Sequence, residues 1–129
     1  MNEKLTKGIE QIIVKELQPI EEKMLKVITE EIDKAATDVY DYLKATTPIG
    51  ASGGLNKSLK KKKSTRKNYY GYDIIYEGED SKGVPYQKIA NILNYGTKDG
   101  RLAPKYFIAR AQRRLRGLDD KINEKISGV

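Results

Sequence analysis

The stretch ANILNYGTKDGRLAPKYFIARA, residues 90–111, predicts two helices joined by a turn and a basic loop. Glycine takes the positive φ that ends a helix, so Gly96 marks the end of a short helix expected over 86–95. Proline suits the first turn of a helix, where its missing N–H removes no bond, so Pro104 marks the start of the next. An apolar stripe then runs from Phe107 to the C-terminal end of the chain. Gly117 is a point where this second helix can break.

The first part of the chain predicts helix. Apolar residues recur at three- and four-residue steps over 1–46, which is the period of an amphipathic helix. Pro19 should break or kink this pattern at Gln18. The part over 19–46 should stop near Thr47-Pro48, because a residue before proline avoids helical geometry. Its stripe is wider than a coiled-coil seam, so packing across a sheet or a neighbouring subunit is favoured over a coiled coil.

The middle of the chain predicts an antiparallel hairpin. A loop of small residues over 48–54 leads into an extended segment over 55–64 and a turn around 65–67. The strand expected over 68–77 alternates, with its one face formed by Tyr70, Tyr72, Ile74 and Tyr76. Together these elements predict one α+β domain over 1–129. Its parts are a helical segment over 1–47 and the hairpin with two C-terminal helices over 48–129.

The charge of the chain is concentrated. The net charge is +7, and residues 48–72 hold seven bases and no acid. One interpretation of this patch is contact with a polyanion such as DNA, or with an acidic partner. The other is a solvated edge strand whose lysines prevent edge-to-edge pairing. Both interpretations stay open, and the patch consists of Lys57, Lys60, Lys61, Lys62, Lys63, Arg66 and Lys67.

The side chains offer little for catalysis. The chain has no histidine and no cysteine, so the commonest general base, nucleophile and thiolate ligands are missing. Neighbouring acids on a helix do not converge on one point, so we expect solvated pairs at Glu21-Glu22, Glu30-Glu31, Glu79-Asp80 and Asp119-Asp120. We therefore expect no enzymatic activity and no catalytic, cofactor or metal site. The sequence has neither a membrane-spanning apolar run nor an apolar signal core, so we expect an intracellular protein or a particle component.

Two segments resemble a known family, the tail-completion or head-to-tail joining proteins of long-tailed bacteriophages. Residues 42–59, YLKATTPIGASGGLNKSL, are similar to that family's helix end, Thr-Pro turn and strand start. Residues 95–97 are similar to its aromatic-Gly-Thr turn, and Pro104, Phe107 and Ala111 to the helix that follows. The family more often has the aromatic directly after the proline, so Tyr106 or Phe107 could take that role. Asn94 stands where the family commonly has an acid.

This resemblance implies a structural protein of the neck, between the head connector and the tail. It implies a homo-oligomeric ring, often of six copies, without catalytic activity. The implied partners are a head connector or stopper protein and a tail terminator or tail-tube protein, within a virion assembled in the host cytoplasm. The structural turn and interface would consist of Tyr95, Gly96, Thr97, Pro104, Phe107 and Arg110. The alternative function is a nucleic-acid-binding module that uses the patch Lys57–Lys67.

Overall fold

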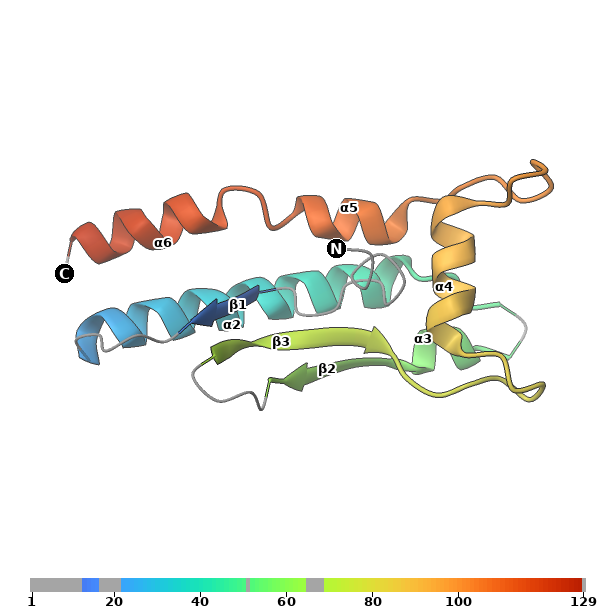
Figure 1. Ribbon diagram of the computed structural model, residues 1–129, viewed down its shortest axis with the longest axis horizontal. Coiled ribbons are helices and arrows are strands. Elements are labelled where there is room, and N and C mark those ends of the chain that lie inside the picture. The colour runs from blue at the N-terminus through green and yellow to red at the C-terminus, as the bar shows by residue number, and fades with distance from the viewer. Residues whose placement is uncertain (1–12, 17–21, 51, 65–68, 129) are drawn as a thin grey trace.

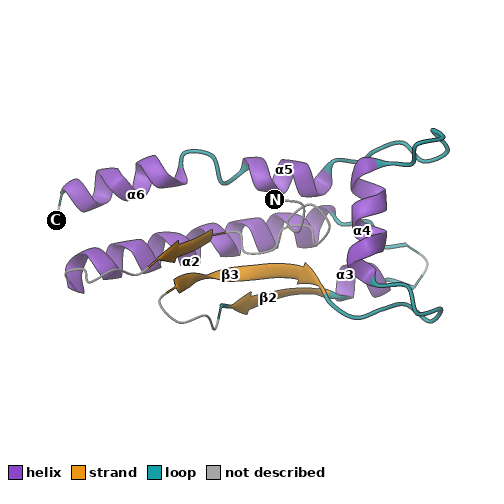
Figure 2. Cartoon of the chain, viewed as in Figure 1, coloured by secondary structure: helices purple, strands orange, loops and turns teal. Residues whose placement is uncertain are grey.

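The computed structural model describes residues 13–16, 22–50, 52–64 and 69–128 of the chain. It has the predicted α+β fold (Figures 1 and 2). The elements in chain order are β1 (Ile13–Glu16), α2 (Glu22–Thr46), α3 (Gly54–Lys57), β2 (Leu59–Lys63), β3 (Tyr69–Tyr76), α4 (Tyr86–Tyr95), α5 (Phe107–Arg113) and α6 (Leu118–Ser127). None of the described helices is long and apolar enough to cross a membrane.

The long helix α2 is the centre of the fold. The strands β2 and β3 pack along one side of it, α5 and α6 run along another, and α4 lies across one end (Figure 1). Its buried apolar side chains recur at three- and four-residue steps, at Ile28, Ile32, Ala36, Val39 and Leu43. The expected packing of this helix across a sheet is confirmed.

The sheet has three antiparallel strands in the order β1-β3-β2. Leu59 of β2 lies opposite Tyr76, and Ile13 of β1 lies opposite Tyr72. The helix expected over 1–18 is therefore wrong at residues 13–16, which form a strand. The β-branched pair Ile13-Val14 suits a strand, and backbone pairing with β3 outweighs the local helical period. The expected break at Gln18 and the expected turn at 65–67 lie outside the described residues.

The extended segment expected over 55–64 is partly wrong, because it begins with the helical turn α3. Gly53 has φ 71° and lets the chain turn into α3, where the N–H of Ser58 donates to the carbonyl of Gly54 at 2.9 Å. The Ser58 hydroxyl also donates to the carbonyl of Leu55 at 2.6 Å. These local bonds hold residues 54–57 in a turn before the strand starts at Leu59.

The core has two parts. The larger one joins α2, the hairpin, α4 and α5, and it contains the rings of Tyr76 and Phe107 in an edge-to-face contact with centroids 6.5 Å apart. The smaller one places Ile122 of α6 against Ile28 and Ile32 of α2. Gly117, at φ 80°, separates α5 from α6, so the helix break expected there is confirmed.

Candidate functional site

The turn after α4 has the predicted glycine geometry. The helix ends at Tyr95 as expected, and Gly96 has φ 76° and ψ −174°, a conformation that is essentially restricted to glycine. A Cβ at Gly96 would lie 2.6 Å from the carbonyl oxygen of Leu102 and 2.9 Å from the nitrogen of Pro104. Glycine is thus required here both by backbone angle and by the closeness of the returning chain.

Thr97 closes the loop that follows this turn. Its N–H donates to the carbonyl of Leu102 at 3.0 Å, and its hydroxyl oxygen accepts the N–H of Leu102 at 3.1 Å. The same hydroxyl donates to Asp99 at 2.7 Å. The backbone N–H of Arg101 and then the Thr97 hydroxyl lower the pKa of the Asp99 carboxyl. The loop is therefore held by its own polar groups.

The position predicted for Pro104 is wrong, because α5 begins at Phe107 and not at the proline. Between them the chain runs back along the end of α4. The N–H of Lys105 donates to the carbonyl of Leu93 at 3.0 Å, and the N–H of Tyr106 to that of Asn94 at 3.1 Å. These carbonyls at the end of α4 have no partner within their own helix, so the backbone N–H groups of Lys105 and Tyr106 supply the missing hydrogen bonds.

Asn94 joins the two helices directly. Its side chain is fully buried, and its Oδ1 accepts the N–H groups of Ile108 at 3.0 Å and of Ala109 at 3.2 Å. Its Nδ2 has no partner among the described residues. Sequence reasoning noted Asn94 only as a departure from the resembled family. The signal available was the preference of asparagine for capping helix N-termini.

Phe107 and Tyr106 take opposite roles. Phe107 is buried in the larger core, whereas the Tyr106 side chain is exposed to solvent. Arg110 is exposed as well, and its guanidinium donates to the carbonyl of Lys105 at 3.1 Å. The structure thus brings Gly96 and Pro104 into contact, and places Tyr95 and Arg110 at the surface around the junction of α4 and α5.

This end of the molecule exposes apolar surface. The exposed side chain of Ile92 lies with Gly96 and Tyr95 around an open hollow of ≈ 600 Å³ on the outer face of α4. The loop that carries Ile49 lies at the same end (Figure 1). Four of the five large apolar side chains that are exposed among the described residues belong to this end, namely Ile49 (66%), Tyr95 (50%), Tyr106 (45%) and Ile92 (40%).

The lysines of β2 mostly contact their own chain. Lys61 lies over the ring of Tyr72, 5.5 Å from its centroid, and Lys63 lies 4.7 Å from that of Tyr70. Lys62 forms an ion pair with Glu77. Lys57 and Lys60 line a groove of ≈ 470 Å³ between α2 and β2. The predicted patch residues Arg66 and Lys67 lie outside the described residues.

The two tyrosines under these lysines bind α2. The hydroxyls of Tyr70 and Tyr72 both donate to Oδ1 of Asp33 at 2.6 Å. Burial and then the Asp33 bond raise the pKa of Tyr70, while for Tyr72 the Asp33 bond is the larger cause of a raised pKa. These rings therefore pack the sheet onto the helix.

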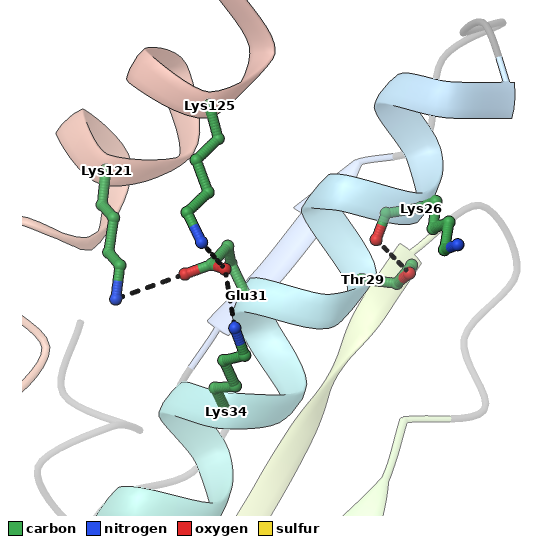
Figure 3. Close-up of polar contacts among 6 residues, drawn as sticks. All are labelled: Lys26, Thr29, Glu31, Lys34, Lys121 and Lys125. Carbon is green, nitrogen blue, oxygen red and sulfur yellow. Dashed lines mark hydrogen bonds and ion pairs between the residues drawn. The ribbon is translucent and has the colours of Figure 1, made fainter. Parts of the chain in front are cut away.

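The expectation that Glu30-Glu31 is a solvated pair is wrong for Glu31. Its side chain is buried, and it accepts Lys125 of α6 at 2.7 Å (Figure 3). Lys34 and Lys121 each lie 3.4 Å from its carboxylate. The hydrogen bond from Lys125 is the largest cause of the lowered pKa of Glu31, against the opposing effect of burial. Two of these lysines, Lys121 and Lys125, come from α6, far along the chain, so the sequence around Glu31 does not indicate them.

Within the described residues, no group of three or more acids could hold a metal ion. No family model matches this chain, and no curated protein or solved structure shows significant similarity to it.

Proposed function

We propose that this protein is a structural subunit of the neck of a long-tailed bacteriophage. In this proposal a ring of copies, often six, joins the head connector or stopper protein to the tail terminator or tail tube. The protein is a virion component that assembles in the host cytoplasm and carries out no reaction. The proposal rests on the resemblance of residues 42–59 and 90–111, and on the apolar surface at the end of α4.

The exposed side chains at that end carry the proposal. Two of them, Ile92 and Tyr95, line the hollow on α4. Isolated exposed apolar residues are ordinary, but several at one end of a molecule are typical of a protein interface. Tyrosine is enriched in such interfaces because it offers a large ring and a polar tip. In a ring, each such contact acts together with the others, so modest contacts give a stable assembly.

The backbone conformation of Tyr106 is a second observation that supports a partner-binding role for this surface. It is the one non-glycine residue with positive φ, 54°, in the described part of the chain. Such a conformation costs about 1–2 kcal/mol for an L-residue. The residue is 45% exposed, so burial within this chain offsets only part of that cost. Strain of this kind is found at functional surfaces, where a partner's contacts compensate for it.

The proposal is tested by disrupting the gene in the genome that encodes it. Electron microscopy of the lysate should show filled heads and complete tails that are not joined. Wild-type protein supplied from a plasmid should restore joined, infectious particles.

A matched pair of variants then tests the surface. Ile92→Ser with Tyr95→Ser removes the apolar side chains around the hollow and should fail to restore joining. Lys23→Ser with Glu30→Ser changes two exposed residues of α2 and should restore it. Joined particles without the gene product would refute the neck function. Full restoration by the Ile92/Tyr95 variant would refute this surface as the contact.

The exposure of Lys57 and Lys60 beside their groove favours contact with DNA as the second candidate. Phosphate contacts release counterions, so such binding should weaken steeply with salt. Lys57→Glu with Lys60→Glu should abolish binding to duplex or single strands in a filter assay. Lys82→Glu with Lys88→Glu, exposed elsewhere, should retain more of it. Equal binding by both variants would exclude the patch.

A further inference from the structure

A second hollow lies between α2 and the segment that links α5 to α6. It has a volume of ≈ 300 Å³. Gly117 lies in its wall. The helix α5 ends at Arg113, the chain turns between the two helices (Figure 1), and Gly117, with its positive φ, directly precedes the start of α6 at Leu118. The helix break therefore leaves a space at a point where a continuous helix would pack on α2.

The walls of this hollow are charged. It is lined by Glu31, Lys34 and Asp38 from α2, and by Arg114, Arg116 and Lys121 from the opposite side. Four cationic side chains thus face two carboxylates, and Lys125 adds a further cation at Glu31.

Both carboxylates already have close partners. Arg114 donates to the two oxygens of Asp38 at 2.8 Å each, and this bond is the main cause of the lowered pKa of Asp38. Glu31 accepts Lys125 at 2.7 Å. A charge-assisted bond of this length is close to optimal, so these two cations neutralise the two acids.

Three cations are less well compensated. Lys34 and Lys121 each form an ion pair with Glu31 at 3.4 Å, which is longer than a good charge-assisted bond, and they share this one carboxylate with Lys125, which lies closer. Arg116 forms no ion pair within the described part of the chain. Like charges gathered at one place repel each other, and an anion placed between them relieves this repulsion.

We propose that this hollow is a binding site for a phosphate group, held by Lys34, Arg116 and Lys121. A phosphate dianion offers several acceptor oxygens and two charges, which match the fork of an arginine and the point charges of two lysines. A volume of ≈ 300 Å³ admits the group together with bridging water. Glu31 does not exclude it, because Lys125 neutralises that carboxylate.

Inorganic phosphate is the first probe. Amide spectra of the ¹⁵N-labelled full chain are recorded as phosphate replaces chloride at constant ionic strength. The N–H signals of Gly117 and Leu118, which line the hollow, should shift to a plateau. Lys34→Gln with Arg116→Gln should raise the dissociation constant at least about tenfold, a loss of about 1.4 kcal/mol.

The control removes the same charge elsewhere. Lys98→Gln with Arg113→Gln changes two exposed cations that do not line the hollow, and should leave affinity within about twofold. Arg116→Gln alone changes an exposed side chain without an ion pair in the described residues, so its weaker binding cannot arise from the loss of an ion pair there, and its free energy of unfolding in urea should match that of the wild type. Absence of a plateau, or equal weakening in the two double variants, would overturn the site.

A competition arm identifies the source of the phosphate. A single-stranded oligonucleotide with internal phosphodiesters is added to the phosphate-bound protein. Displacement that is lost with Lys34→Gln and Arg116→Gln supports the site and identifies a nucleic-acid backbone as the source. Retention of phosphate supports the site for a free or terminal phosphate. Displacement that survives both substitutions would show that the anion lies elsewhere and overturn the proposal.

Discussion

The side-chain oxygen of Asn94 accepts the backbone N–H of Ile108 at 3.0 Å, which links the buried end of α4 to the first turn of α5. The residue that directly precedes α5, Tyr106, makes no side-chain cap bond to it. Asn94 thus caps a helix to which it does not belong. A helix of seven residues is too short to be stable alone, so this cap and the burial of Phe107 hold it in place.

Asn94→Ala should destabilise the protein strongly for a single polar side chain. The substitution leaves the buried N–H groups of Ile108 and Ala109 without their acceptor, which costs about 1–3 kcal/mol. The free energy of unfolding in urea measures this loss. Asn123→Ala, at an exposed position of α6, should change it by less than about 0.5 kcal/mol. Equal effects would contradict the capping role of Asn94.

Gly96→Ala and Gly100→Ala separate backbone angle from crowding. Both glycines have φ 76°, so alanine should cost about 1–2 kcal/mol at either site. A Cβ at Gly100 meets nothing within 4 Å, whereas one at Gly96 collides with the backbone of Leu102 and Pro104. We therefore expect Gly96→Ala to lower the free energy of unfolding by about 3 kcal/mol or more. Similar losses in the two variants would mean that the chain does not return so closely to this turn.

The elements that the sequence predicted well are those whose determining residues lie within the element or directly beside it. The helix over 86–95 was predicted with its observed bounds, because its apolar period and Gly96 lie within one short segment. The strand Ile13–Glu16 was missed because its partner, β3, lies far along the chain. In the sequence, Ile13 continues the three- and four-residue spacing of the apolar residues before it, which is typical of a helix. The pairing that overrides this period is not visible in the local sequence.

The candidate site shows the same division. Gly96 was predicted from its own conformational freedom, and Phe107 from the stripe that it begins. The helix start predicted at Pro104 was wrong, because the N–H groups of Lys105 and Tyr106 donate to carbonyls at the end of α4. The residues directly after the proline are therefore not helical. Glu31 was expected in water because two of its three lysine partners, Lys121 and Lys125, cannot be identified before α6 is placed beside α2.

Two adjacent aromatic residues test which ring belongs to the core. Phe107→Ala removes a buried ring in contact with Tyr76 and should cost about 3–5 kcal/mol of unfolding free energy. Tyr106→Ala removes a largely exposed ring from the same junction and should cost less than about 1 kcal/mol. Urea denaturation compares the two variants. A larger loss for Tyr106→Ala would reverse the assignment of Phe107 to the core.

The lysines of β2 should differ in their effect on stability. Lys61→Ala and Lys63→Ala each remove a cation from the face of a tyrosine, which should cost about 0.5–1 kcal/mol. Lys60→Ala removes an exposed side chain and should cost less than about 0.5 kcal/mol. Thermal or urea unfolding of the three single variants gives this comparison. Identical stabilities would show that Lys61 and Lys63 serve only as surface charge.

The buried carboxylate of Glu31 should make the attachment of α6 sensitive to acid. Its pKa is lower in the folded protein than in the unfolded chain, so the folded state favours the charged form. This stabilisation is fully present above the unfolded value of about 4.3 and is lost as the pH falls through the lower folded pKa. The lysine partners are exposed and regain water when the acid is removed, so Glu31→Gln should cost about 1.5–3 kcal/mol near neutral pH.

The measurement is the free energy of unfolding of wild type and Glu31→Gln from pH 7 down to pH 3. The difference between the two proteins should be constant at neutral pH and shrink in the acid range, since protonation removes the same charge that the substitution removes. Asp38→Asn breaks a solvent-exposed pair with Arg114 and should cost only about 0.2–1 kcal/mol at pH 7. If Glu31→Gln is as mild as Asp38→Asn, or if its deficit persists at pH 3, Lys121 and Lys125 do not hold α6 through this carboxylate. The apolar contact of Ile122 with Ile28 and Ile32 would then be what fixes α6 to α2.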